Sequence, residues 1–166
     1  MKASHFSQDI QEILTLLSKH QVRYLIVGGE AVIYYGHARL TGDIDLFYEA
    51  SSGNVANLYQ TLDEFWKGDI PEVDSSEDLL EPGIILQFGV PPNRLDFLNT
   101  IDGVSFQEAW SNKTTVHIQV ADNKVPVYFI GLDELIKNKE TLGRYKDLED
   151  LKYLRKAREQ NRSNST

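Results

Sequence analysis

The stretch from Gly28 to Leu46 reads GGEAVIYYGHARLTGDIDL, and its last four residues decide how the chain is interpreted. Side chains alternate between the two faces of a β-strand, so Asp43 and Asp45 point to one side while the apolar residues beside them point into the core. Two neighbouring carboxylates repel each other unless a cation or a shared proton relieves the repulsion. A pair of divalent metal ions would do so, and would also hold a nucleoside triphosphate.

Two glycines precede this segment. Val22–Val27 is predicted to be a buried strand because most of its residues are apolar, and Gly28-Gly29 then forms a turn where the backbone can approach a ligand closely. If a helix starts near Glu30, its free N–H groups form an anion site at this turn. On their own the glycines favour a tight turn without a ligand, but the downstream aspartates reverse that preference. The spacing does not fit the dinucleotide motif G-x-G-x-x-G.

A third carboxylate follows in a predicted hairpin. Residues 83–90 and 94–99 are interpreted as two strands joined by the turn-forming cluster Pro91-Pro92-Asn93. Asp96 lies in the second strand between Leu95 and Phe97, and a carboxylate in such a strand requires a partner. The partner is either a metal shared with the earlier aspartates or a salt bridge to Arg94 or another base.

Together these residues resemble the nucleotidyltransferase superfamily of the polymerase-beta type, whose signature is a Gly-Gly or Gly-Ser turn, a short helix, Asp-x-Asp, and a third carboxylate on a later strand. The small bacterial members, including the AbiEii toxin-like group, are the most similar. The resemblance implies an α+β fold with a mixed β-sheet flanked by helices, in one domain over residues 1–166 with a frayed tail at 160–166. It implies transfer of a nucleoside monophosphate from a nucleoside triphosphate (NTP) to an acceptor hydroxyl.

The same resemblance assigns roles to individual residues. Asp43, Asp45 and Asp96 are expected to be catalytic and to hold two Mg²⁺ ions, with Asp96 also helping to deprotonate the acceptor. The phosphates of the NTP are expected at Gly28 and Gly29. Residues like Arg39 and Thr41 commonly stand just before Asp-x-Asp in similar families. Arg39 is interpreted either as a phosphate contact or as a partner of the two aspartates, because an arginine at this position satisfies both descriptions.

A second block of resemblance follows the last predicted strand, where Gly131 to Leu142 is expected to be helical. Lys139 corresponds to a position that meets nucleotide phosphates, and Arg144 and Asp147 correspond to later charged positions in a segment similar to Arg-x-x-Asp-x-x-Asp-Leu. Composition alone would interpret these residues as a solvated helix face, so their assignment depends on the resemblance.

The rest of the chain is predicted to supply the core and its covering helices. Apolar residues recur at a helical period in residues 4–20, where Ser7 is a candidate N-cap, and in residues 54–67. Residues 68–82 are acidic and are expected to form a solvated loop with one helical turn. A short helix is predicted over 105–110 and two strands over 113–119 and 125–130, the second at a sheet edge because it contains Pro126.

Composition limits the possible functions. The chain has 166 residues, a net charge of −8 and no cysteine, so disulfides and thiolate metal sites are excluded. The acidic balance makes binding to bulk duplex nucleic acid an unfavoured function, because such binding depends on neutralising phosphates. We find neither a signal-peptide pattern nor an apolar run long enough to span a bilayer, so a cytoplasmic location is the default expectation.

Two other functions are compatible with the same residues. The chain is also interpreted as a non-catalytic nucleotidyltransferase-fold protein that acts through a protein partner, for example in a toxin–antitoxin pair. A nuclease using the three aspartates is a third possibility, which the acidic charge disfavours. The chain lacks a clear second helical domain to select an acceptor, so a partner chain or a homodimer is expected to supply one. Glu30 must point away from the phosphates if the transferase interpretation is correct.

Overall fold

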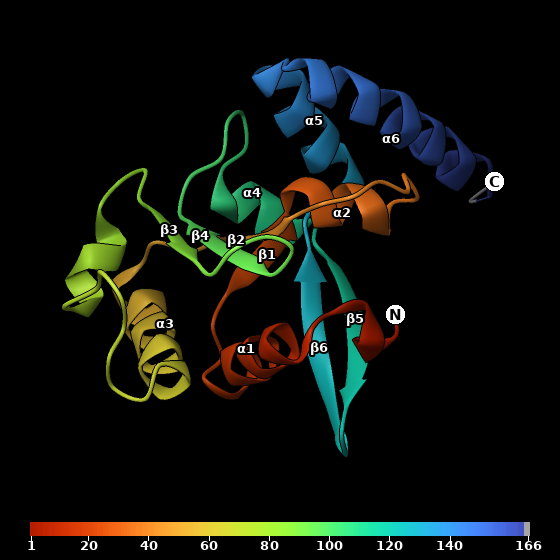
Figure 1. Cartoon of the computed structure of the whole chain (residues 1–166). Helices are drawn as coiled ribbons and strands as arrows, with labels where there is room; N and C mark the ends of the chain where they lie inside the picture. Colours follow the sequence, from red (N-terminus) through yellow and green to blue (C-terminus); the bar gives the residue numbers. More distant parts are fainter. Residues whose placement is uncertain (165–166) are drawn as a thin grey trace.

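A six-stranded mixed sheet forms the centre of the protein, whose computed structural model describes residues 1–164 (Figure 1). The strands lie in the order β3-β4-β2-β1-β6-β5. Their bounds are β1 (Tyr24–Val27), β2 (Asp43–Tyr48), β3 (Ile85–Phe88), β4 (Arg94–Leu98), β5 (Thr114–Val120) and β6 (Asn123–Phe129). The two parallel pairs are β2 with β4 and β1 with β6, and the other neighbours are antiparallel. The expected α+β fold with a mixed sheet is confirmed.

Helices cover both sides of this sheet. In Figure 1 the helices α1 and α3 lie below β1–β4, whereas α2 and α4 lie above them and the α5–α6 pair extends from the same upper side. The helices are α1 (Gln8–Lys19), α2 (Gly28–Tyr34), α3 (Ser52–Phe65), α4 (Phe106–Ser111), α5 (Leu132–Leu142) and α6 (Tyr145–Asn164), with 3-10 turns η1 (Ala3–His5) and η2 (Ser76–Leu80). None of the helices in this described part combines the length and the apolar character needed to cross a bilayer.

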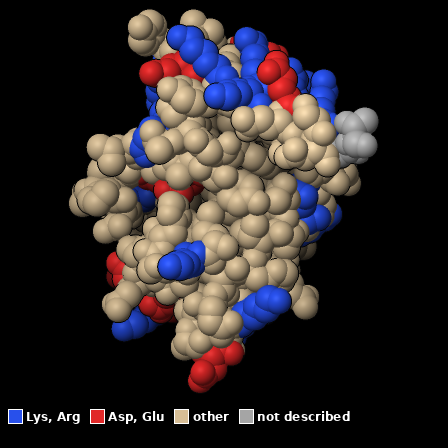
Figure 2. All heavy atoms as spheres, turned by 90° about the vertical axis from the view of Figure 1, so that its right-hand side faces the viewer, with Lys and Arg blue, Asp and Glu red and all other residues tan. Residues whose placement is uncertain are grey.

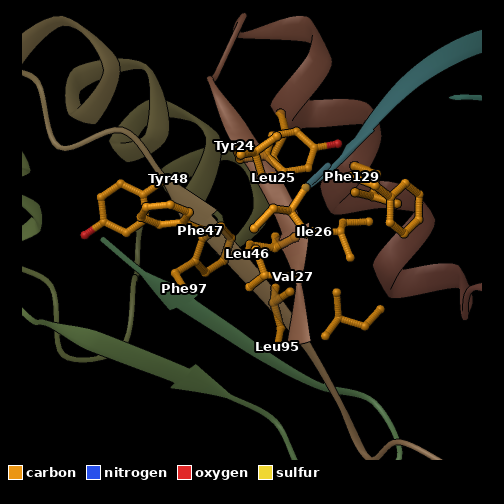
Figure 3. Packing of buried hydrophobic residues seen from close by; sticks show 14 of the residues in the cluster. Tyr24, Leu25, Ile26, Val27, Leu46, Phe47, Tyr48, Leu95, Phe97 and Phe129 are labelled. Atoms are coloured by element: carbon orange, nitrogen blue, oxygen red, sulfur yellow. The ribbon is translucent and has the colours of Figure 1, made fainter. Parts of the chain in front are cut away.

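The core is built around β1 and β2. All four residues of β1 are buried, as expected for a strand covered on both faces, and they pack beside Leu46, Phe47 and Phe97 from the neighbouring strands (Figure 3). In β2 the first four residues alternate, because Asp43 and Asp45 are partly exposed while the apolar residues next to them are buried. The alternation predicted for this strand is therefore present.

Helix starts follow local capping chemistry. The side chain of Ser7 accepts a hydrogen bond from the backbone N–H of Ile10, so the predicted N-cap of the first long helix is confirmed. The helix starts there rather than at Ser4, since residues 3–5 form a separate 3-10 turn. The acidic segment 68–82 is irregular apart from η2, as expected.

Two expectations about strands and ends are wrong. The edge strand is β5, whereas β6, which contains Pro126, has neighbours on both sides. Proline is tolerated because β1 pairs with β6 only at Phe129, so Pro126 lies on the part of the β5–β6 hairpin that projects beyond β1. The tail expected to fray from residue 160 is helical to Asn164, since α6 continues without a glycine or proline, and residues 165–166 lie outside the described residues.

One buried amide ties the far end of the β1–β2 pair to α3. The Asn54 side chain accepts a hydrogen bond from the Arg23 N–H (2.7 Å) and donates to the carbonyls of Arg23 (3.0 Å) and Glu49 (2.9 Å). Asn54→Ala leaves these backbone groups without their partner, so we expect the free energy of unfolding to fall by about 2–4 kcal/mol in urea titrations. Asn57→Ala on the same helix is the control and should change it by less than ~0.5 kcal/mol; equal effects would contradict this role.

Candidate functional site

The parallel pairing of β2 with β4 brings three carboxylates together. Asp45 lies opposite Asp96 in the register, and Asp43 lies opposite Arg94. One oxygen from each of Asp43, Asp45 and Asp96 can be chosen so that all lie within 4.8 Å of one another. Asp96 is almost completely buried, whereas the other two are partly exposed. Carboxylate oxygens are the donors that Mg²⁺ and other hard cations prefer, so this donor set fits a divalent metal.

Arg94 lies within this cluster. Its Nε and Nη2 donate to the two oxygens of Asp96 at 2.9 and 3.0 Å, and Nη2 also donates to Asp43 at 2.6 Å. Gln87 from β3 adds a hydrogen bond to Asp96 at 3.0 Å. The salt bridge between Asp96 and Arg94, which we considered as the alternative to a metal site, is therefore present alongside the three-carboxylate cluster.

Asp45 differs from its two neighbours. Its side chain makes no hydrogen bond within residues 1–164, and it lies so close to Gly28 that a Cβ added there would overlap the carboxylate. Gly28 also has a φ of +61°, a conformation that other residues rarely adopt. Burial, together with the charges of Asp43 and Asp96, raises the pKa of Asp45 to about 6, although nearby Lys139 and Arg94 partly offset this.

This pKa predicts how stability depends on pH without divalent metal. The folded state binds the Asp45 proton more tightly than the unfolded chain does, so the free energy of unfolding falls as pH rises from about 4 to above about 6. Asp45→Asn removes this unfavourable charge. In thermal unfolding with a chelator, we expect the variant to be more stable than wild type at pH 7.5 by about 1–3 kcal/mol. This difference in the free energy of unfolding should disappear near pH 4. A stability difference between variant and wild type that stays constant with pH would contradict this charge effect.

Thr41 and Arg39 lie beside the glycine turn. The Thr41 hydroxyl donates to the Asp43 carboxylate at 2.9 Å and thereby orients it. A Cβ added at Gly29 would lie only 2.7 Å from the Thr41 hydroxyl and 2.8 Å from Arg39 Nη2, so the absence of a side chain lets these groups approach the turn. The Nε of Arg39 is 3.6 Å from Asp150. The interpretation of Arg39 as a partner of Asp43 and Asp45 is therefore wrong, because its ion pair goes to α6.

A second ionic cluster joins α5 to α6. The ammonium of Lys139 is 2.9 Å from Asp147 and 3.0 Å from Asp150, and all three side chains are buried. Arg144 makes a second ion pair with Asp147 at 2.6 Å and is itself half exposed. Burial raises the pKa of Asp147, but hydrogen bonds from Arg144 and Lys139 outweigh it and bring the pKa down to about 2. Lys139 and Asp147 therefore do not form the solvated helix face that composition suggests.

Asp150 is a structural member of this site to which our sequence analysis gave no role. It also approaches His37 Nδ1 at 3.2 Å, and the His37 ring stacks on Tyr153 of α6 with 3.8 Å between centroids. The spacing of Asp147 and Asp150 by three residues puts them on one helix face, and that spacing is the signal in the sequence. The α2–β2 loop, which carries His37 and Arg39, is thus held against α6.

A cavity of about 260 Å³ connects the two charged clusters. Gly28 and Asp45 line one part of it, and Lys139 and Arg144 line another. Its apolar wall comes from β1, β3, β4, α5 and the segment after β4, through Val27, Ile85, Leu98, Ile101 and Leu142. Glu30 does not face this space, because its carboxylate is bound to His5 Nε2 at 2.8 Å. Glu30 therefore points away from the cavity.

Removing the charge of Asp147 tests the buried cluster. Asp147→Asn leaves Lys139 with one carboxylate partner in a buried site, so we expect the free energy of unfolding to fall by about 3 kcal/mol at pH 7. The pKa of Asp147 is lowered, so its contribution is present above about pH 4 and lost as the pH falls towards 2. Urea titrations at several pH values should show the difference from wild type shrinking below pH 4. Exposed Glu149→Gln should change stability little, and an equal loss there would contradict the prediction.

Comparison with known proteins agrees with this geometry. A family model described as "Nucleotidyltransferase of unknown function (DUF6036)" matches residues 4–156. The matched range contains the glycine turn, the three carboxylates of β2 and β4, and the ionic cluster of α5 and α6. A search of curated proteins finds no match to the chain. The resemblance to nucleotidyltransferases drawn from the sequence is confirmed.

Proposed function

The chain belongs to the family of nucleotidyltransferases of unknown function (DUF6036), and we propose that it moves a nucleoside monophosphate from an NTP to an acceptor hydroxyl. The observation that carries this proposal is the meeting of Asp43, Asp45 and Asp96 beside the Gly28 turn. Family membership alone indicates a transferase. The three carboxylates add a site whose chemistry suits Mg²⁺ and a triphosphate.

Asp43, Asp45 and Asp96 are the residues that would hold Mg²⁺, with two ions expected as in other two-metal sites. When bound, these ions neutralise the charge that develops on the phosphates during transfer. The structure supports this assignment in two ways. The donors are all carboxylate oxygens, and the lack of a side chain at Gly28 leaves the Asp45 carboxylate room beside the turn.

The proposed reaction exchanges one phosphorus–oxygen bond for another. The acceptor oxygen attacks the α-phosphorus, the bond to the β-phosphate oxygen breaks, and pyrophosphate leaves. We assign the acceptor proton to Asp96, as the resemblance implies. Asp96 Oδ1 accepts one hydrogen bond and Oδ2 accepts two, from Arg94 and Gln87, so Oδ1 retains acceptor capacity for that proton. The chain's own contribution is to position the triphosphate and to hold this carboxylate in reach.

Phosphate contacts are proposed at the glycine turn and at the cationic side of the cavity. Gly28 and Gly29 allow the triphosphate to approach the backbone, and Arg39 Nη2 lies beside this turn. Arg144 is half exposed and lines the cavity, so it can turn a guanidinium towards a phosphate. Lys139 lines the same cavity but is held by Asp147 and Asp150, so its proposed part is a fixed positive charge near Asp45.

The acceptor is proposed to be a small molecule or a protein rather than bulk duplex nucleic acid. The net charge of −8 opposes long-range attraction to a polyanion. On the side that carries α6 and the β5–β6 hairpin, Lys and Arg are separated by uncharged surface, and acidic side chains lie among the basic ones near the top (Figure 2). A protein partner or a homodimer remains the proposed source of acceptor selection.

One observation favours the alternative, a non-catalytic protein that acts through a partner, for example in a toxin–antitoxin pair. Arg94 already neutralises part of the carboxylate charge, so the cluster has a structural counter-charge without any metal. Measured turnover separates the two functions.

Calorimetric titration tests the transferase directly. ATP, GTP, CTP and UTP are each titrated with and without Mg²⁺ into wild type and into the double variant Asp43→Asn/Asp45→Asn. We expect Mg²⁺-dependent binding of at least one NTP to wild type and its loss in the variant, because the carboxylates hold the ions that bridge to phosphate. The matched control, Asp69→Asn/Asp74→Asn in the exposed acidic loop, removes the same charge and should bind as wild type does.

The donor found in this way is then used for turnover with candidate acceptors. Asp43→Asn should lower the rate by roughly 100-fold or more while its circular dichroism spectrum matches that of wild type, because the transition-state charge loses its counter-ion. Undiminished turnover in this variant would rule out the metal role of Asp43. Absence of binding by all four NTPs would favour the partner-binding alternative.

A further inference from the structure

The sheet register places Arg94 beside the three carboxylates. Arg94 is the first residue of β4, it lies opposite Asp43 in the β2–β4 register, and it precedes Asp96 by two residues on the same strand. Alternation along β4 therefore directs Arg94 and Asp96 to the same side as Asp43 and Asp45. The guanidinium spans two of the three carboxylates with three hydrogen bonds of 2.6–3.0 Å.

The hydrogen bonds of the cluster are distributed unevenly. Both oxygens of Asp96 accept from Arg94 or Gln87, and both oxygens of Asp43 accept, one from Thr41 and one from Arg94. Asp45 accepts none within residues 1–164. A divalent cation held by all three carboxylates would therefore approach oxygens that already carry a cationic donor. Two cations on the same oxygens repel each other, so the guanidinium and the metal compete for these carboxylates.

We propose that Arg94 is the resident counter-cation of the carboxylate cluster, and that a divalent metal must displace its guanidinium from Asp43 and Asp96 to be held by all three carboxylates. The inference rests on the proposed metal site, and adds that Arg94 and the metal compete for its carboxylates. The Arg94 side chain is 30% exposed, so it has a path towards solvent. The released guanidinium is a suitable partner for the phosphates of an incoming NTP, because arginine binds phosphate oxygens in a bidentate manner.

Removal of Arg94 leaves the carboxylates oriented. Thr41 still donates to Asp43 and Gln87 still donates to Asp96, so Arg94→Gln retains one hydrogen bond on each. The variant has one positive charge fewer beside the metal oxygens. A neighbouring charge changes the affinity of a carboxylate for a cation by about 10–1000-fold, as it does for a proton. We therefore expect metal to bind Arg94→Gln at least about tenfold more tightly than wild type.

The experiment uses the metal alone. Mg²⁺ is titrated calorimetrically, and Mn²⁺ by electron paramagnetic resonance, into the full chain without nucleotide. Arg23→Gln is the matched control: Arg23 pairs with Glu49 near the other end of β1 and has a similar exposure, and its loss should leave metal affinity unchanged. Arg94→Lys keeps the charge and should stay within about threefold of wild type, which separates charge from side-chain shape.

A measurement on wild type avoids dependence on a variant that fails to fold. The Arg94 Nε–H resonance in ¹⁵N-labelled protein is assigned by its loss in Arg94→Lys. Mg²⁺ should shift it or broaden it as the bond to Asp96 breaks, while the Arg23 resonance stays in place. Equal metal affinity in Arg94→Gln and wild type, an unmoved Arg94 resonance at saturating Mg²⁺, or no metal binding by any form would each overturn the inference.

These outcomes are separable from failure of the proposed function. Metal binding that tightens in Arg94→Gln without any NTP binding would support the competition and reject the transferase. Metal binding that is equal in both forms, together with Mg²⁺-dependent NTP binding, would reject the competition and leave the transferase intact.

Discussion

The register between β2 and β4 is the constraint on which the site depends. Side chains on a strand have a period of two, so a slip of one residue in β4 would carry Asp96 to the opposite face and bring Leu95 into its place. The apolar residues on either side of Asp96 oppose that slip, because Leu95 and Phe97 are buried in the observed register and would move to the opposite face with β4. The same packing that builds the core therefore also places three carboxylates side by side. Their repulsion is a cost of the site that cations must offset.

Three basic residues offset the carboxylate charge of the β2–β4 cluster and of the neighbouring α5–α6 cluster. These are Arg94, Lys139 and Arg144, and they do so in different ways. Lys139 is enclosed with Asp147 and Asp150, so its charge is fixed, and its loss would remove the cation that lies between two buried carboxylates. Arg144 and Arg94 are instead partly exposed, with Arg144 paired to Asp147 and Arg94 paired to Asp43 and Asp96. The cavity beside Asp45 is lined by both Lys139 and Arg144. This arrangement suits a ligand that brings its own negative charge.

The ionic cluster of α5 and α6 also explains how the α2–β2 loop is held in place. His37 and Arg39 lie in the α2–β2 loop, and both approach Asp150 on α6. The loop ends at Thr41, whose hydroxyl orients Asp43. A change at α6 is thus connected through the loop to the carboxylates by direct contacts. The sequence interpretation of Arg39 as a partner of the nearer aspartates did not include this contact, because α6 is more than 100 residues away along the chain.

Local sequence determined the elements and the candidate residues. Alternation in DIDL, the glycine pair and the apolar run before it, and the Asp in the second strand of the predicted hairpin were sufficient to predict strands and the three aspartates, since these depend on neighbours within a strand. The mixed sheet was predicted from the family resemblance that these residues carry. The tertiary structure alone decided which charges meet. In it Arg94 pairs with Asp43 and Asp96, and Arg39 pairs with Asp150. Lys139 is buried in an ion pair, and Pro126 lies on a projecting hairpin rather than in an edge strand. The physical reason is that strand periodicity is a property of adjacent residues, whereas an ion pair depends on distances between segments that only the packed sheet and helices bring together.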